Sequence, residues 1–310
     1  MEFKHIPIML NEIITGLNIN PDGIYIDCTL GGAGHSTEII KRLSQNGRLI
    51  GIDKDEEALS VCKERLSKFQ NVTFVHNDFK NIEEIFSELN LVQVDGVLID
   101  LGVSSYQIDN AERGFSFNNN GRLDMRMDKS QEFSAYEVVN NYSEEKLVKI
   151  FYEYGEESFA KQIARNIIKA RAEKPIETTF ELKEIIENSI PKKILYKLGG
   201  ASKKVFQAIR IEVNGELDKL NTTLEFLISK LKPGGRIAVL TFHSLEDRIV
   251  KNVFKQHSTN CICPPKAPIC ICNHKADVVL INKKPIVASS EEMKQNSRST
   301  CAKLRIIEKI

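Results

Sequence analysis

A glycine-rich turn and a later acidic residue are the first features of this chain that could do chemistry. The turn, Leu30 to His35, follows the apolar segment 23–27, and Asp53 ends the next apolar segment, 19 residues after Gly34. Glycines let a backbone approach a ligand closely, and a carboxylate at that spacing can accept both hydroxyls of a ribose. NAD, FAD and S-adenosylmethionine all satisfy this pattern, and a tight turn with an ordinary strand-terminal aspartate would satisfy it too.

Two further positions favour S-adenosylmethionine over a dinucleotide. Asp78 and Phe79 follow a third apolar segment, where an acid and an apolar neighbour can hold the edge and face of an adenine. Asp100 ends a fourth, and parallel sheets open their ligand crevice at the carboxyl ends of strands. The turn also departs from G-x-G-x-x-G, because His35 stands directly after its last glycine.

Short apolar segments alternate with helical patterns through the first hundred residues. Strands are predicted at 23–27, 48–53, 72–75 and 94–99, and helices at 36–43, 56–69 and 82–89. Ser36 is the expected N-cap of the first helix. Alternation of this kind predicts a Rossmann-like α/β fold, a parallel sheet wrapped by helices.

The alternation stops for about a hundred residues and then resumes. Residues 104–133 are polar and aperiodic, and helices are predicted at 134–140, 144–154, 158–172 and 179–189. An amphipathic helix near 203–230, a turn at 233–235, a strand at 236–241 and late strands at 276–282 and 302–309 follow. We therefore expect a discontinuous α/β core, 1–103 and 206–310, interrupted by an all-helical insertion domain, 104–205.

Charge is distributed unevenly along the chain. The 310 residues carry 43 Lys and Arg against 42 Asp and Glu, but residues 191–310 carry 22 against 10. A basic segment of this kind indicates a polyanionic partner, although solvated faces that balance in the folded molecule would give the same count. The candidate phosphate contacts are Lys192, Lys193, Lys203, Lys204, Lys283 and Lys284.

Composition narrows the class of protein and its compartment. A hydrophobic content of 42% and a charged content of 27% are ordinary for a globular chain and exclude a disordered or collagen-like one. No apolar run approaches the ~20 residues that span a bilayer, and Met1 to Leu10 lacks the features of a signal peptide. With seven cysteines and no disulfide framework, a cytoplasmic protein is expected.

Several sequence blocks together resemble the MraW/RsmH family of 16S ribosomal RNA cytosine-N4 methyltransferases. The resemblance spans nearly the whole chain in order, and it rests on 31–36, 100–105, 113–117, 123–128, 205–211, 233–236, 241–250 and 296–305. It implies that the α/β core is an S-adenosylmethionine-dependent methyltransferase and that the helical insertion recognises the substrate. The reaction it implies is transfer of a methyl group from S-adenosylmethionine to a cytidine in the decoding region of the small ribosomal subunit. Two motifs depart from the family's usual form: Asn296 to Cys301 lacks a proline and an arginine, and Ala201 to Lys204 replaces His-Pro-Ala-Thr-Arg.

The resemblance also implies a set of cofactor contacts. They carry over onto Ala33, Gly34, His35, Asp53, Phe79, Asp100 and Gln107. All except Gln107 lie at the turn and strand ends already selected from the residues alone.

Asp100 is the candidate catalytic residue. Cytosine N4 is a weak nucleophile because its lone pair is delocalised into the ring, so an acceptor for the amine proton would help it react. Asp100 or the backbone carbonyls of Leu101 to Val103 could fill that role. A target base that leaves its stack could be received by Phe115 or Phe117, although both could equally pack the loop onto the core.

Other polar residues remain open in role. Asp124, Arg126 and Asp128 could form an ion network in the insertion or position the substrate, and His243 is either a core histidine or faces the target base. Cys261, Cys263, Cys270 and Cys272 could hold zinc or be free thiols, and the expected catalysis needs no metal. The sequence leaves the oligomeric state open, a homodimer included. The alternatives to RNA methylation are methylation of a small molecule or protein, and RNA binding without catalysis.

Overall fold

The computed structural model describes residues 7–198, 202–264 and 269–310. Ala201, the first residue of one motif that departs from the family form, lies outside them. The chain forms two compact units, one made of Met1–Gly102 with Asp218–Ile310 and the other of Val103–Leu217.

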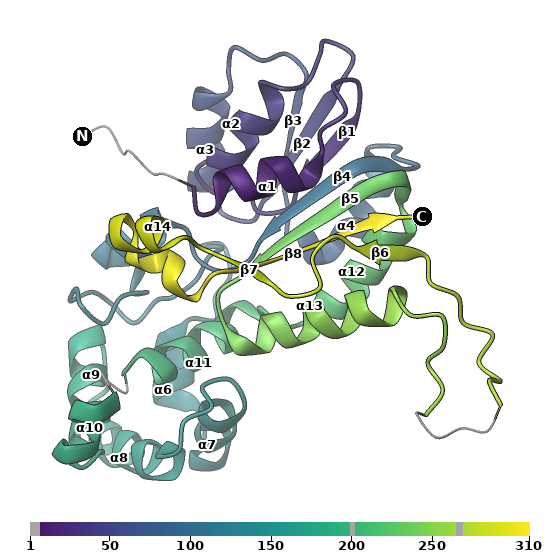
Figure 1. Ribbon diagram of the computed structural model, residues 1–310. Coiled ribbons are helices and arrows are strands. Elements are labelled where there is room, and N and C mark those ends of the chain that lie inside the picture. The colour runs from purple at the N-terminus through teal and green to yellow at the C-terminus, as the bar shows by residue number, and fades with distance from the viewer. Residues whose placement is uncertain (1–6, 199–201, 265–268) are drawn as a thin grey trace. The chain divides into compact units, whose positions relative to one another are not determined.

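The first unit is built on a mixed sheet (Figure 1). Its strands are β1 (Ile24–Asp27), β2 (Arg48–Asp53), β3 (Val72–His76), β4 (Val94–Asp100), β5 (Leu231–Thr241), β6 (Val278–Leu280), β7 (Ile286–Val287) and β8 (Lys303–Lys309). The order is β3-β2-β1-β4-β5-β8-β6, with β7 beside β8; β1 to β5 pair in parallel and β8 runs antiparallel to β5. The expected Rossmann-like α/β fold is confirmed.

Alternate side chains of the strands bury against helices on both faces of this sheet. Ile26, Ile50 and Val97 face a cluster formed with α4 (Ile82–Glu88), α12 (Leu220–Ser229) and α13 (Ser244–His257). Tyr25, Leu49 and Leu98 face the opposite cluster with α1 (Leu10–Leu17), α2 (Gly34–Ile40) and α3 (Glu56–Arg65). Because helices cover both faces, the middle residues of β1, β2 and β4 are apolar on both sides, and charged residues stand toward the strand ends. The 3₁₀ turn η1 (Phe79–Asn81), α14 (Ser290–Gln295) and η3 (Ser297–Cys301) complete the unit.

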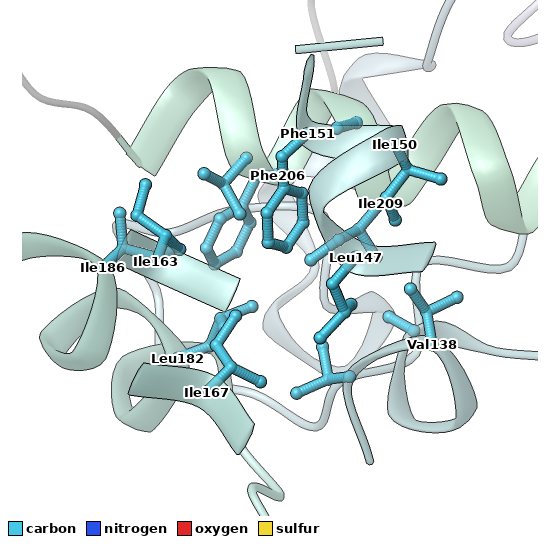
Figure 2. Packing of buried hydrophobic residues seen from close by; sticks show 14 of the residues in the cluster. Val138, Leu147, Ile150, Phe151, Ile163, Ile167, Leu182, Ile186, Phe206 and Ile209 are labelled. Atoms are coloured by element: carbon cyan, nitrogen blue, oxygen red, sulfur yellow. The ribbon is translucent and has the colours of Figure 1, made fainter. Parts of the chain in front are cut away.

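The second unit is helical and has its own core. It contains α5 (Ser105–Asp109), η2 (Ala111–Arg113), α6 (Ala135–Asn141), α7 (Glu144–Glu153), α8 (Ala160–Glu173), α9 (Thr179–Asn188), α10 (Lys192–Leu198) and α11 (Ser202–Asn214). Figure 2 shows Val138, Leu147, Ile163, Leu182 and Phe206 converging from five of these helices. The sequence places the end of the insertion at residue 205, but α11 runs through that position and buries its apolar face in this core, so the unit extends to Leu217.

Three local predictions are wrong for identifiable reasons. The helix expected over 203–230 is two helices, because Gly215 and Lys219 adopt left-handed backbone conformations (φ 55° and 56°) between α11 and α12. The turn expected at 233–235 is an irregularity inside β5, where the register against β4 shifts. Ser36 does not cap its helix: α2 begins at Gly34 with Ala33 as its N-cap residue.

Within the residues that the structure describes, no helix combines the length and apolar character that crossing a membrane requires.

Candidate functional site

The carboxyl ends of β1 to β4 bring the predicted acidic residues to one edge of the sheet. Asp53 ends β2, and its carboxylate accepts hydrogen bonds from the backbone N–H of Gly31 at 2.7 Å and of Asp55 at 2.9 Å. Gly31 has a φ of 50°, a conformation that glycine adopts without strain. The carboxylate and the glycine turn therefore form one connected structure at the end of neighbouring strands β1 and β2.

The start of α2 carries the next predicted residues. Ala33 has a φ of 56° at the N-cap position, and a Cβ on Gly34 would lie 2.4 Å from Cγ of Pro7, so the chain passes too closely there for a side chain. His35 is 6% exposed; its Nδ1 lies 3.5 Å from Oδ2 of Asp100, and its Nε2 is 3.0 Å from the carbonyl oxygen of Ile8. The turn thus places an imidazole directly beside the candidate catalytic carboxylate.

Asp100 is held at the end of β4 while part of its side chain stays accessible. Its backbone N–H donates to Oγ1 of Thr29 at 2.7 Å, which fixes the strand end against the turn, and its side chain is 28% exposed. Burial, followed by the negative charges of Asp27 and Glu246, raises the pKa of Asp100 to about 8. Near neutral pH this carboxyl therefore carries a proton much of the time.

Two more carboxylates at the same edge have raised pKa values. Asp27, 1% exposed, accepts from the hydroxyl of Ser36 at 2.7 Å and the N–H of Thr29 at 3.1 Å, but burial still raises its pKa to about 6. Burial also raises the pKa of Asp53, against the lowering effect of its backbone hydrogen bonds. Negative charge is thus crowded into a poorly solvated edge, an environment that a cationic ligand would relieve.

Phe79 and Asp78 follow β3 at this edge. Phe79 is half-buried and packs against the core, and Asp78 accepts from the N–H of Lys80 at 3.0 Å. Asp78 also lies 3.2 Å from Nζ of Lys80 and 3.6 Å from Nζ of Lys54. Two lysine ammonium groups therefore balance the negative charge of Asp78.

These residues fit S-adenosylmethionine. The carboxylate of Asp53 would suit ribose hydroxyls, the ring of Phe79 would suit an adenine face, and the ionised form of Asp100 would suit the cationic sulfonium and amine. Asp100 lies at β4, whose neighbour β1 carries the glycine turn, and this is where the order of the parallel strands reverses.

His243 lies at the end of β5, in the same unit. It is the N-cap residue of α13: its Nδ1 accepts from the N–H of Glu246 at 3.4 Å, and its Nε2 lies 3.0 Å from Oε1 of Glu246. Its side chain is 4% exposed. The structure therefore gives His243 the role of a buried cap, and its partner Glu246 adds negative charge near Asp100.

Gln107 belongs to the helical unit. It forms a capping box at the start of α5, where its Oε1 accepts from the N–H of Ser104 at 3.0 Å and its own N–H donates to Oγ of Ser104 at 3.2 Å. Because it lies in the second unit, its contribution to a cofactor site stays a prediction.

The aromatic and charged residues of the helical unit hold its long loop together. Phe115 is buried in the core, and Phe117 contacts Phe206 edge to face at 5.5 Å between ring centroids. Arg126 makes a two-point contact with Asp124, at 3.0 Å from Nε to Oδ1 and 2.6 Å from Nη2 to Oδ2. Asp128 accepts from the backbone N–H and the hydroxyl of Ser130, which closes a local turn.

The predicted phosphate contacts are mostly exposed. Lys192 and Lys193 begin α10, Lys203 and Lys204 lie in the first turn of α11, and the Lys283–Lys284 pair connects β6 to β7. Among these six, Lys204 is half-buried and donates to the carbonyl oxygen of Glu156 at 2.8 Å.

Sequence reasoning missed two residues that shape these sites. Asp27 stands directly before the glycine turn, at a strand end like the selected acids, and this position could have identified it. Arg113 is completely buried and donates to the carbonyl oxygens of Arg126 at 2.9 Å and Met127 at 3.0 Å. An arginine in a polar, aperiodic segment gives no sign of burial, so nothing in the pattern could have found it.

The fold and the acidic edge are those expected of an α/β methyltransferase, and comparison with known proteins shows the family. The chain belongs to the MraW methylase family, whose model matches residues 2–310. It is 54% identical over 310 residues to a protein of Clostridium botulinum (strain Loch Maree / Type A3) named ribosomal RNA small subunit methyltransferase H, with all of both chains covered. A protein of the same name from Clostridioides difficile (strain 630) is 53% identical over 311 residues, again with both chains fully covered. The expected methyl donor, S-adenosylmethionine, follows from membership of this family.

Proposed function

We propose that this protein transfers a methyl group from S-adenosylmethionine to the N4 amine of a cytidine in the decoding region of 16S ribosomal RNA. The proposal rests on sequence identity of 53–54%, over the full length, to relatives named as small-subunit ribosomal RNA methyltransferases. The basic character of residues 191–310 supports a polyanionic substrate. The choice of cytidine N4 rests on the sequence motifs that resemble the MraW/RsmH family.

The donor would be held by residues of the first unit at the carboxyl edge of the sheet. When bound, S-adenosylmethionine supplies an electrophilic methyl group on a sulfonium. Asp53 binds the ribose hydroxyls and Phe79 packs against the adenine, while Ala33, Gly34 and His35 let the turn follow the ligand closely. The resemblance to the MraW/RsmH family adds Gln107 to the proposed set.

Asp100 would accept a proton from the target amine. Methyl transfer from a sulfonium is an in-line displacement, so orientation of the amine accounts for much of the rate. A carboxylate that accepts one amine hydrogen makes the nitrogen lone pair more available, and it stabilises the positive charge that develops on nitrogen. The raised pKa of Asp100 makes it a stronger base than an ordinary carboxylate, which suits this task.

His35 would keep Asp100 in position. Its imidazole is fixed by the carbonyl oxygen of Ile8 on one side and lies beside Oδ2 of Asp100 on the other. A charged or polar neighbour on this side leaves the remaining carboxylate oxygen available for the amine. His35 is thus a positioning residue for the proton acceptor.

The test is direct product identification. Unmodified 30S subunits and free 16S RNA are incubated separately with the protein and labelled methyl donor, and the digested nucleosides are analysed by mass spectrometry. We expect N4-methylcytidine, and we expect Asp100→Asn to bind RNA normally but to form little product. Absence of N4-methylcytidine on every RNA substrate would exclude the proposal, while methylation of a protein or small molecule would favour the first alternative.

A further inference from the structure

Four cysteines gather in the segment that connects α13 to β6. Cys261, Cys263, Cys270 and Cys272 place their sulfur atoms within 4.8 Å of one another. The sulfur of Cys261 lies 3.4 Å from that of Cys270 and 3.8 Å from that of Cys272, and the sulfurs of Cys270 and Cys272 are 3.6 Å apart. All four are free thiols.

We propose that these four thiolates bind one zinc ion as a structural site, separate from the methyltransferase chemistry. Four sulfurs in a tetrahedron at about 2.3 Å from zinc are separated from one another by about 3.8 Å. The three separations given above lie close to this value, and all four sulfurs lie within 4.8 Å of one another. They are too long for a disulfide, whose sulfurs are about 2.05 Å apart. They are too short for an iron–sulfur cluster, because its iron and sulfide ions stand between the cysteine ligands.

Backbone N–H groups point at the sulfurs as they do around metal-bound thiolates. The N–H of Ile262 donates to Sγ of Cys272 at 3.4 Å, and the N–H of His274 donates to the same sulfur. The N–H of Cys263 donates to Sγ of Cys261. Asn273 adopts a left-handed conformation (φ 51°), which turns the chain so that the N–H of His274 reaches back to Cys272. Such donors stabilise negative sulfur and orient it toward a metal.

Hydrophobic burial does not explain why this segment folds. None of its described residues between Ser258 and Asp277 is buried, and the side chains of Ile262, Ile269 and Ile271 are 50%, 74% and 82% exposed. A segment without a core needs another source of stability, and a bound zinc ion supplies folding free energy directly.

The set of ligands is closed, which indicates a structural rather than a catalytic ion. His274 follows the last cysteine by two residues, but its Nε2 lies 2.9 Å from the carbonyl oxygen of Gln256 and is occupied there. At the base of the segment, His257 pairs with Asp277 at 2.8 Å. Four thiolates therefore fill all positions of a tetrahedral zinc ion and leave none for water or substrate.

Metal analysis of the whole chain tests this proposal. The protein is purified without chelators, and its metals are measured by mass spectrometry against protein concentration. We expect about one zinc per chain, loss of nearly all of it in a Cys270→Ser/Cys272→Ser variant, and full retention in Cys301→Ser, a matched control in which an exposed thiol outside the cluster is replaced. Adding Co²⁺ to the metal-stripped wild-type chain should give the intense visible bands of tetrahedral cobalt with thiolate ligands.

The opposite results are equally clear and independent of RNA methylation. Zinc below about a tenth of an equivalent with intact thiols, or cobalt bands without thiolate charge transfer, would overturn the proposal. So would stoichiometric iron, or an intact mass reduced by the hydrogens lost on disulfide formation. The cobalt titration uses the wild-type chain, so it gives an answer even if the double variant does not fold. Because neither measurement needs RNA, a failure here leaves the proposed methylation untouched.

Discussion

Replacing Asp100 by asparagine should remove most of the pH dependence of S-adenosylmethionine binding. In the free protein, burial and the charges of Asp27 and Glu246 raise the pKa of Asp100 to about 8, so the carboxyl is largely protonated below that pH. A cationic ligand prefers the ionised form and must displace the proton. Affinity should therefore rise with pH and level off above the pKa of Asp100.

The size of the effect follows from the ionised fraction. With a pKa of about 8, this fraction falls from about one half near pH 8 to about one in a hundred near pH 6. The dissociation constant should therefore increase roughly 50-fold over that range, which corresponds to about 2.3 kcal/mol. Partial exposure of the side chain, 28%, weakens the interaction with the ligand and makes this an upper value.

Isothermal titration calorimetry at several pH values, in two buffers with different ionisation enthalpies, measures both affinity and proton release. The ligand's own amine titrates near the same pH, and Asp27 titrates near pH 6, so the Asp100→Asn profile serves to separate their contributions. Asp95→Asn is the matched control, because Asp95 lies at the opposite end of β4 and pairs with Lys232. If the affinity for S-adenosylmethionine changes with pH in the same way in wild type and Asp100→Asn, the ionisation of Asp100 does not control binding.

Three further changes have defined outcomes. Asp53→Asn places an amide where two backbone N–H groups now meet a carboxylate, so calorimetry should show about 10- to 100-fold weaker cofactor binding; unchanged affinity would remove Asp53 from the site. Arg113→Met leaves two buried carbonyls without their donor and should destabilise the helical unit by about 2–4 kcal/mol, seen as faster hydrogen exchange of its helices; wild-type protection would argue against this role. Replacing Lys283 and Lys284 by alanines should reduce the slope of log affinity for RNA against log salt concentration by about 1.5. Lys63→Ala, in the acidic part of the chain, should leave that slope unchanged. Equal effects of the two changes would show that neither site contacts RNA specifically.

The fold was largely predictable because strands that are buried on both faces appear in the sequence as short apolar runs. Strands such as β2 and β4 are continuous apolar runs, and the helices between them keep a regular apolar face. The break between α11 and α12 was not predictable, because the apolar period continues across Gly215 and Lys219 while only their backbone conformations change. The predicted end of the helical unit at residue 205 was therefore wrong as well, because α11 packs on the core of that unit.

The positions of the strand-end acids were predictable from the sequence, but their pKa values and hydrogen bonds were not. Strand ends and a glycine turn located Asp53 and Asp100, since parallel strands must end at the same edge. The hydroxyl of Ser36 could accept from helix N–H groups as a cap or donate to a nearby carboxylate. Only the folded structure shows that it donates to Asp27. The raised pKa of Asp100 likewise depends on burial and on Glu246, which is distant in sequence. The close approach of the four cysteines is a tertiary feature of the same kind.

The proposed reaction modifies one nitrogen of one base, N4 of a cytidine, so mapping the methyl group on the RNA tests it most directly. Unmodified 30S subunits are treated with the protein and an isotopically labelled donor, and the RNA is digested into oligonucleotides and sequenced by mass spectrometry. We expect label on N4 of a single cytidine in the decoding region, with little label when Asp100→Asn replaces the wild type. Label on another base, on a ring carbon or ribose of that cytidine, or equal labelling by the variant would contradict it.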